Sequence, residues 1–323
     1  MTMSLDLTAG IGKIITIVLL IGVGFLARKK NIITAESKKS ITDLVLGLII
    51  PIAVFNSFLS DFDWEKLRNS LVLLLIALVY YPILQFVVSK IFFGRYPKDE
   101  AKRRLFQFGI TYSNAVFMGL PFAQALFGSD GLFYASVFNL PYNVYLWSMG
   151  YAALTRQPMD KKGIKNTFTN PVIIACLLGY LFWLVSVVIP DQVITALAPV
   201  FDVFATISGA NTPMSMILIG AIVAEAQFIK MLRDKDIWIF SLVKLIVVPG
   251  LLFGVLYALG FRGWIVAVPT VIAAMPACAT GGILAAKFDI QKELSASIIT
   301  FTTMLSALTA PIWLLVLLAT VVQ

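Results

Sequence analysis

SNAVFMGLP, residues 113–121, lies in the middle of an apolar run that extends from about residue 105 to residue 127. Proline has no N–H to donate to an i→i−4 helical bond, and glycine weakens a helix, so we predict that a membrane helix breaks at this stretch. In hydrocarbon, backbone groups without partners are costly, and a break is tolerated only where it is buried in protein or lines a cavity. The sequence therefore predicts a binding site at this stretch.

The composition is that of a membrane protein. Of the 323 residues, 59% are hydrophobic and only 13% are charged, and the mean hydropathy is +0.92. Soluble domains carry about 25% charged residues. The longest polar gaps, near residues 94–104 and 156–166, are too short to hold a soluble domain. We therefore expect one membrane transport domain that fills residues 1–323.

Ten apolar runs follow one another along the chain. Each is long enough to cross a bilayer, which takes about 20 apolar residues. The seventh run is interrupted by Pro199 and Pro213. The sequence thus predicts an all-α polytopic membrane protein with ten transmembrane helices. The runs cover residues 10–27, 40–60, 69–93, 105–127, 131–154, 170–189, 193–224, 237–260, 264–287 and 293–321.

Most Lys and Arg residues lie in short loops between these runs, as the positive-inside rule describes. We therefore interpret the net charge of +8 as a signal of topology and not of nucleic-acid binding. The loops of opposite parity hold only Lys66, Arg68 and Arg262. This predicts a multi-pass protein of the plasma or inner membrane with both termini outside. The basic loops contain Arg28, Lys29, Lys30, Lys38 and Lys39; Arg95, Lys98, Lys102, Arg103 and Arg104; Arg156, Lys161, Lys162 and Lys165; Lys230, Arg233 and Lys235; and Lys287 and Lys292.

The two halves of the chain share a pattern. Because five spans is an odd number, residues 168–323 begin on the opposite membrane face from residues 1–155, which predicts two inverted repeats. Shifting the chain so that Asn114 falls on Pro276 also places Pro51 on Pro213, Gly47 on Gly209 and Gly119 on Gly281. Coincidence remains the alternative explanation for these matches.

Under this shift, a second break is predicted at AMPACATGG, residues 274–282. Two interrupted helices in corresponding positions of inverted halves mark the substrate site of many secondary transporters. The N-terminal ends of half-helices bring unpaired N–H groups and positive dipole ends to the middle of the membrane. Such a site suits an anion.

The fourth run resembles that of a known family. The residues that carry the resemblance are Ser113, Asn114, Phe117-Met118-Gly119-Leu120-Pro121, Ala125-Leu126-Phe127-Gly128 and Gly131-Leu132, together with Ile50-Pro51 in the second run. They are similar to the auxin efflux carrier (PIN-like) family, in its bacterial branch related to malonate and malate carriers.

The resemblance implies a fold like that of sodium–proton antiporters and bile-acid symporters. Two inverted five-helix repeats would place the broken fourth and ninth helices across each other, and some helices would scaffold a homodimer while the crossing bundle moves. It also implies that Asn114 contacts the substrate and that Pro276 is its counterpart. The long cytosolic loop of the plant exporters is missing from this chain.

Further polar residues within the runs are candidates for the site. Asn139 and Asn143 are four residues apart and share a helix face, with Tyr142 beside them, and they either line the cavity or bond a neighbouring helix. Lys244 lies about two turns into the eighth run and either attracts a carboxylate, senses protonation or pairs with a carboxylate such as Asp202. The full candidate set is Ser113, Asn114, Gly119, Pro121, Asn139, Tyr142, Asn143, Pro276, Thr280 and Gly281 for substrate, and Asp202, Asn211, Thr212 and Lys244 for coupling or structure.

Several classes of chemistry find no support in the sequence. Histidine is absent, and the two cysteines, Cys176 and Cys278, lie in separate apolar runs, so we expect no metal site, no disulfide framework and no catalytic residues. No nucleotide-binding loop appears, and we expect no cofactor and no enzymatic activity. Cys278 lies beside a predicted break and is a minor candidate for the cavity wall.

Taken together, these features predict a secondary active transporter of a small organic carboxylate, either a malate- or malonate-like dicarboxylate or an auxin-like monocarboxylate. The expected partners are this substrate, membrane lipid and a coupling proton or sodium ion. A symporter or antiporter coupled to sodium or protons, a channel and a non-transporting membrane receptor are the alternatives.

Overall fold

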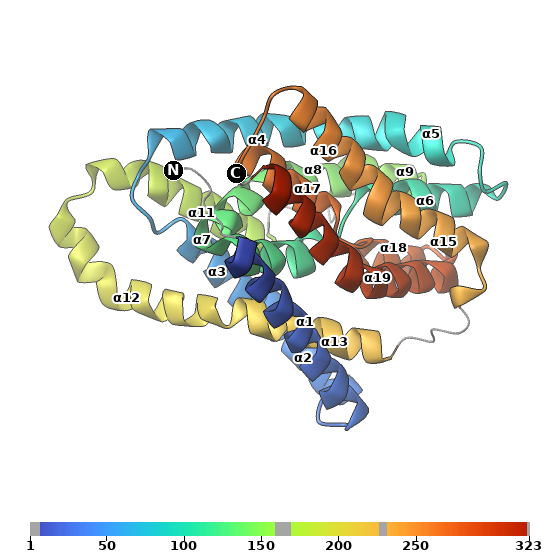
Figure 1. The fold of residues 1–323 in the computed structure, drawn as a ribbon, viewed down its shortest axis with the longest axis horizontal. Helices are drawn as coiled ribbons and strands as arrows, with labels where there is room; N and C mark the ends of the chain where they lie inside the picture. Colours follow the sequence, from blue (N-terminus) through green and yellow to red (C-terminus); the bar gives the residue numbers. More distant parts are fainter. Residues whose placement is uncertain (1–6, 159–168, 226–230, 322–323) are drawn as a thin grey trace.

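The computed structural model describes residues 7–158, 169–225 and 231–321, and the regular secondary structure in these ranges is helical (Figure 1). Lys161, Lys162, Lys165 and Lys230, on which part of the predicted topology depends, lie outside the described residues. In chain order the elements are α1 (Leu7–Lys29), α2 (Ala35–Leu44), η1 (Val45–Ile49), α3 (Ile50–Ser57), α4 (Trp64–Ile83), η2 (Leu84–Val88), α5 (Ser89–Phe93), α6 (Glu100–Thr111), η3 (Ala115–Gly119), α7 (Leu120–Phe138), α8 (Leu140–Tyr145), η4 (Leu146–Gly150), α9 (Tyr151–Thr155), α11 (Pro171–Val185), η5 (Ser186–Val188), α12 (Asp191–Gly209), α13 (Asn211–Ala224), α15 (Lys235–Leu242), η6 (Val243–Val247), α16 (Val248–Ala258), α17 (Trp264–Ala273), α18 (Ala279–Lys287) and α19 (Lys292–Thr320).

Each predicted apolar run is helical for most of its length, which confirms a polytopic membrane protein. Within the described ranges, 8 helical stretches are long and apolar enough to cross a membrane, and α17 is a shorter apolar helix. One stretch, Ala115–Thr155, has 41 residues, about twice the length that one crossing requires. The exact number of ten crossings stays a prediction.

Gly128 divides this long stretch. Its φ of 70° and ψ of −155° are non-helical, so α7 consists of two pieces that meet at a kink. A residue with a side chain rarely adopts this positive φ, and glycine adopts it at little cost. The kink falls between the fourth and fifth predicted runs, where the sequence places the boundary.

Three proline residues are accommodated by a short π-helical segment that comes just before them. The segments η1, η3 and η6 precede Pro51, Pro121 and Pro249. In each case the residue before the proline donates its N–H to the carbonyl five positions earlier, which lets the helix continue past a residue that has no N–H. The prediction that Gly119 and Pro121 belong to the break itself is therefore wrong, because the unwound residues, 112–114, come before η3.

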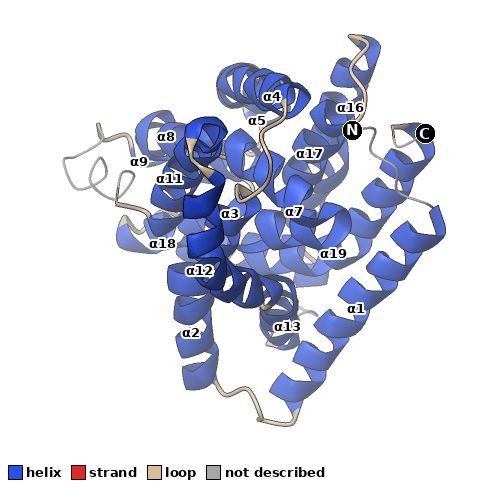
Figure 2. Ribbon diagram, turned by 90° about the vertical axis from the view of Figure 1, so that its left-hand side faces the viewer, coloured by secondary structure: helices blue, strands red, loops and turns tan. Residues whose placement is uncertain are grey.

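Figure 2 shows α7, α17 and α3 near the middle of the molecule, with α4 and α5 on one side and α1 on another. α1 packs most closely on α13. The backbone of Gly24 meets the carbonyl of Ile217 so closely that a Cβ at Gly24 would lie 1.9 Å from that oxygen. Small residues permit this approach of two helices within a membrane.

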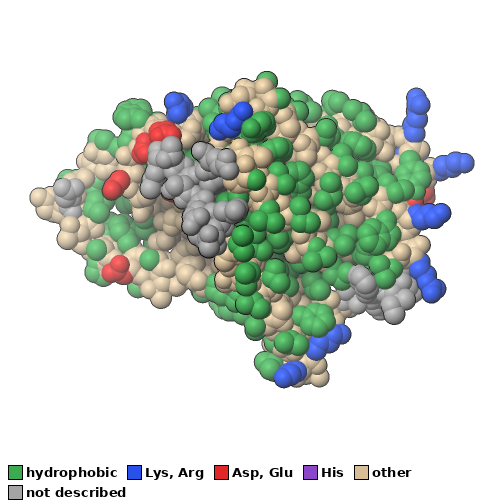
Figure 3. Space-filling model, viewed as in Figure 1, with side chains coloured by type: hydrophobic (Ala, Val, Ile, Leu, Met, Phe, Trp, Pro, Cys, Tyr) green, Lys and Arg blue, Asp and Glu red, His purple; other side chains and the backbone are tan. Residues whose placement is uncertain are grey.

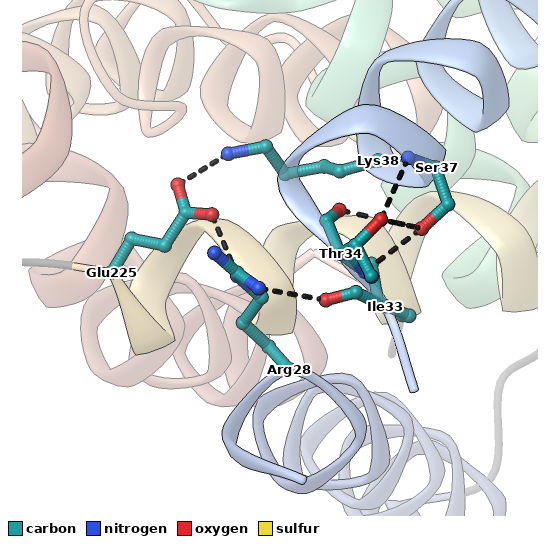
Figure 4. A network of polar contacts seen from close by, with 6 residues as sticks. All are labelled: Arg28, Ile33, Thr34, Ser37, Lys38 and Glu225. Atoms are coloured by element: carbon teal, nitrogen blue, oxygen red, sulfur yellow. Dashed lines mark hydrogen bonds and ion pairs between the residues drawn. The ribbon is translucent and has the colours of Figure 1, made fainter. Parts of the chain in front are cut away.

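A polar network ties the corner between α1 and α2 to the end of α13 (Figure 4). Arg28 donates from Nε to Glu225 Oε1 at 2.7 Å, and Lys38 pairs with the other carboxylate oxygen. Arg28 also donates to the carbonyl of Ile33 at 3.0 Å. Burial alone would raise the pKa of the Glu225 carboxyl, but the hydrogen bonds and charges of Lys38 and Arg28 outweigh it and lower that pKa.

Charges separate between the two ends of the molecule. On the face seen in Figure 3, the Lys and Arg side chains lie mostly at the right-hand end and on the α1–α2 hairpin, and the Asp and Glu side chains mostly at the left-hand end. This separation agrees with the interpretation of the basic loops as topology signals. The orientation of the termini stays a prediction.

Candidate functional site

The two predicted breaks meet in the structure. α6 ends at Thr111 and α17 ends at Ala273, and the unwound residues that follow pair as a short antiparallel bridge. The N–H of Asn114 donates to the carbonyl of Pro276 at 2.7 Å, and the N–H of Cys278 donates to the carbonyl of Tyr112 at 3.1 Å. We call residues 112–114 and 274–278 the crossing. Its backbone groups bond each other, which is how irregular backbone is tolerated at membrane depth.

Neighbouring helices satisfy further groups of the crossing. The Tyr142 hydroxyl donates to the carbonyl of Ser113 at 2.7 Å. On the other segment, the N–H of Ala277 donates to Thr302 Oγ1 at 3.2 Å. Ser113, Tyr142 and Thr302 are all buried. Of the predicted site residues, Ser113 thus belongs to the crossing, and Tyr142 on α8 supports its backbone.

Gly119, at the end of η3, packs closely against α17 and the second segment of the crossing. A Cβ at this position would be 2.7 Å from Ile272 Cδ1 and 3.4 Å from Met275 Cγ. Pro121, two residues later, is buried within α7, and its carbonyl accepts a bond from the Thr212 hydroxyl at 3.2 Å. Gly119 and Pro121 therefore contribute to helix packing, and neither has a polar side-chain group that could bind a ligand.

Asn114 is the one residue of the crossing that is not buried, and we call it, together with the nearby Val116, Ala279 and Thr280, the accessible face. Asn114, Val116 and Thr280 are partly exposed and Ala279 is exposed, whereas Pro276 and Gly281 are buried. Within the described part of the chain, the Asn114 side chain makes no hydrogen bond, so its amide is available to a ligand.

The helical segments that leave the crossing begin next to these residues, η3 at a buried position and α18 at an exposed one. η3 starts at Ala115 and α18 starts at Ala279. N–H groups in the first turn of a helix have no acceptor within it, and the positive end of the helix dipole lies there. The two ends lie at opposite ends of the bridge, with the Asn114 amide next to η3, and such helix ends are suited to an anion.

Lys244 lies behind the crossing. It belongs to the π segment η6 and is fully buried, and its ammonium donates to Ser113 Oγ at 2.6 Å and to the carbonyl of Ile110 at 3.2 Å. Asp202 is exposed on α12 and forms no ion pair with Lys244. The structure therefore contradicts pairing with Asp202, one of three alternatives that the sequence left open.

Asn139 and Asn143 lie apart from the accessible face. Both are buried, and they line a cavity of about 10 Å³ together with Ser136, Leu120 and residues of α11. The amide of Asn143 donates to the carbonyl of Asn139 at 3.2 Å, and Asn139 Oδ1 has no protein partner within the described residues. The cavity is about the size of one water molecule, so this face of the fifth run turns toward a neighbouring helix.

Asn211 and Thr212 lie at the junction of α12 and α13, just before Pro213. Asn211 is fully buried, and its amide donates to Gln124 Oε1 at 2.6 Å. Gln124 also donates to Ser208 Oγ at 3.0 Å. Gln124 was not among the candidates predicted from sequence. It is a lone amide in an apolar run, and this signal could have identified it. These bonds join α7 to the interrupted seventh run.

Two larger hollows lie away from the crossing. A groove of about 540 Å³ between α4 and α16 is lined almost entirely by aliphatic side chains. A polar hollow of about 620 Å³ is lined by Asp61, Lys66, Asp130 and Trp264, among others. Neither includes a residue of the crossing.

Metal coordination finds no support in the residues that the structure describes. No group of three or more His, Cys, Asp or Glu side chains lies close enough to hold an ion. Cys176 and Cys278 are free and buried, and Cys278 belongs to the crossing.

Comparisons with known proteins agree with this architecture. A family described as "Membrane transport protein" matches residues 9–166 and 156–314. An "Uncharacterized transporter" of the archaeon Methanothermobacter thermautotrophicus is 25% identical over 305 residues, which cover 94% of this chain and 97% of that protein. The "Uncharacterized transporter YfdV" of Escherichia coli K12 is 23% identical over 322 residues, or 96% of this chain and 98% of that protein. The yeast "Protein ECM3" is 26% identical over 181 residues, or 52% of this chain and 29% of that protein.

Proposed function

The chain belongs to the membrane transport protein family, which is the auxin-efflux-like family that the sequence resembles, and on this premise we propose that it is a secondary active transporter of a small organic carboxylate. A dicarboxylate such as malate or malonate and an auxin-like monocarboxylate are the substrates that the resemblance favours. The carboxylate binds at the accessible face of the crossing.

The pairing of the two breaks is the observation that supports this proposal. The first turns of η3 and α18 then lie at opposite ends of the bridge, and Asn114, next to η3, has a side chain without a partner within the described residues. The N–H groups of Ala115 and Gly281 already bond the carbonyls of Ser113 and Cys278. A carboxylate can accept hydrogen bonds from the other first-turn N–H groups and from the Asn114 amide, and the positive dipole ends offset its charge. Thr280, in the first turn of α18, adds a hydroxyl at the same face.

Transport requires that this face open alternately to the two sides of the membrane. We place the moving part in the crossing helices, with the remaining helices as a scaffold and a homodimer as the assembly. The division into inverted repeats, 1–155 and 168–323, belongs to this proposal, because alternating access in such folds exchanges the conformations of two related halves.

A cation–proton antiporter of related fold is less well supported. Such a protein needs acidic residues at the crossing, and residues 105–127 and 264–282 contain none. A channel or a receptor could use the same face, and counterflow of labelled against unlabelled carboxylate across a proteoliposome membrane distinguishes a carrier from both.

The test is the Asn114→Ala variant in proteoliposomes, assayed for uptake of labelled mono- and dicarboxylates. We expect uptake to be abolished while yield and thermal stability stay as in the wild type, because the Asn114 side chain bonds no other described residue. Gln157→Ala is the control. It removes an exposed amide that lies outside the fourth and ninth runs, and the variant should transport normally. Unchanged substrate affinity in Asn114→Ala would contradict the site.

A further inference from the structure

Lys244 is a buried cation at the crossing that the carboxylate site does not use. Its side chain is fully buried, and its ammonium bonds two oxygen atoms of the fourth run, Ser113 Oγ at 2.6 Å and the Ile110 carbonyl at 3.2 Å. It forms no ion pair with a described carboxylate. Isolated charges in a protein interior are costly, so the surroundings of this ammonium must offset that cost.

The break itself supplies the acceptor. In an uninterrupted helix the N–H of Asn114 would donate to the carbonyl of Ile110, four residues earlier. Here the N–H of Asn114 donates to Pro276 instead, which leaves the Ile110 carbonyl to the Lys244 ammonium. This carbonyl lies in the last turn of α6, a helix of 12 residues whose C-terminal end carries a partial negative charge.

The position is therefore one where a cation is expected. In transporters with interrupted helices, the unwound carbonyls and C-terminal ends of half-helices are the groups that coordinate a coupling sodium ion. A carbonyl and a hydroxyl oxygen are also the neutral ligands that a hard cation takes. In this chain both oxygen atoms are bonded by a lysine side chain from the eighth run.

We infer that the Lys244 ammonium is a tethered cation that takes the position of a coupling sodium ion at the C-terminal end of α6. The wild-type crossing then needs no sodium ion there, and Lys244 is a positioning residue that holds Ile110 and Ser113 against η6. The coupling role of this position rests on the proposed carrier function, whereas its occupation by the ammonium does not.

The test uses two variants of the full chain, purified in detergent, with the thermal unfolding midpoint as readout. Lys244→Ala removes the ammonium and leaves space, whereas Lys244→Met fills most of that space with an apolar side chain. The unfolding midpoint of Lys244→Ala should be several degrees higher in ethylammonium than in tetramethylammonium. The midpoints of Lys244→Met and of the wild type should be the same in both salts. Equal responses of the two variants, or none in Lys244→Ala, would overturn the inference.

The wild type provides a measurement that needs no variant. Replacing choline by sodium should leave its unfolding midpoint and its carboxylate uptake unchanged, and a specific stabilisation by sodium would overturn the inference. If Lys244→Ala does not fold, a double-mutant cycle between Ser113→Ala and Lys244→Met replaces it. We then expect Lys244→Met to shift the midpoint less in the Ser113→Ala background, and equal shifts in both backgrounds would contradict the contact.

These readouts separate the inference from the proposed function. Rescue of Lys244→Ala by ethylammonium in a protein that transports no carboxylate would refute the carrier proposal alone. Carboxylate transport that requires sodium in the wild type would refute the tethered cation alone.

Discussion

The N–H of Asn114 donates a 2.7 Å hydrogen bond to the carbonyl of Pro276. These two residues, far apart in the chain, are also the pair that one shift of the sequence places on each other. The bond joins the two interrupted segments at their centre and releases the Ile110 carbonyl to Lys244. The proposed substrate site and the buried Lys244 ammonium therefore share one structural origin.

Because α1 and α13 are in close contact, we expect that adding one methyl group at Gly24 greatly lowers the stability of the protein. In Gly24→Ala, the new Cβ would lie 1.9 Å from the carbonyl oxygen of Ile217, which is backbone and cannot move aside alone. We expect a loss of about 2 kcal/mol or more in stability, from the range for overpacked positions. Gly22→Ala in the same helix has no atom within 4 Å of its Cβ and should unfold at or slightly above the wild-type temperature in a thermal scan.

We expect that removing the Tyr142 hydroxyl destabilises the crossing. Tyr142→Phe removes the bond to the Ser113 carbonyl, which is buried, and should cost about 1 kcal/mol. Tyr80→Phe is the matched control, because the Tyr80 hydroxyl is buried without a partner in the described residues. Thermal unfolding of both variants checks this, and a larger loss for Tyr80→Phe than for Tyr142→Phe would contradict it.

We expect a similar loss of stability when the hydroxyl of Thr302, which bonds the second segment of the crossing, is removed. In Thr302→Val the N–H of Ala277 loses its acceptor in a buried position, which should cost about 1–3 kcal/mol and reduce carboxylate uptake. Thr309→Val in the same helix removes a hydroxyl that has no partner within the described residues. Unfolding midpoints and carboxylate uptake are compared between the two valine variants. Equal values in both variants would contradict the role of Thr302 as the acceptor for Ala277.

The Glu225 carboxylate predicts a dependence on pH. Its pKa is lowered in the folded protein, because the hydrogen bonds and charges of Lys38 and Arg28 outweigh the effect of burial. A lowered pKa means that the stabilisation is fully present above the unfolded-state pKa and is lost as the pH falls through the folded-state pKa.

Glu225→Gln should therefore unfold at a lower temperature than the wild type near neutral pH, and this difference should shrink as the medium becomes acidic. Thermal scans at a series of pH values measure it. Asp43→Asn, an exposed carboxylate in α2, serves as the control for general effects of charge. A difference that grows toward acid pH would show that Lys38 and Arg28 do not stabilise the carboxylate.

Much of the fold and the positions of the two breaks at the candidate site could be predicted from sequence. The apolar runs gave the helices, because span length depends on bilayer thickness and not on tertiary contacts. Asn114 and Pro276 marked the two breaks, because an amide and a proline in an apolar run are local signals. The boundary between the fourth and fifth runs was also predicted, whereas the kink at Gly128 that forms it was not.

The side-chain partners could not be predicted in the same way. Pro121 was assigned to the break, but the π segment before it lets the helix continue. The ammonium of Lys244 finds the Ile110 carbonyl only because α6 ends beside η6, which is a tertiary relationship. Asn139 and Asn143 face α11 and not the accessible face, and helical periodicity gives a shared face without giving its neighbour.

The bridge between the two unwound segments also has a mechanical consequence. Separating Tyr112 from Cys278, or Asn114 from Pro276, would leave main-chain donors and acceptors without partners in an environment that has no water to replace them. In the transport cycle proposed above, the segments on either side of this bridge would therefore travel as one rigid piece. A bound solute would be carried through the bilayer together with its binding groups, and the bending that this requires would fall on the connections at the edge of that piece.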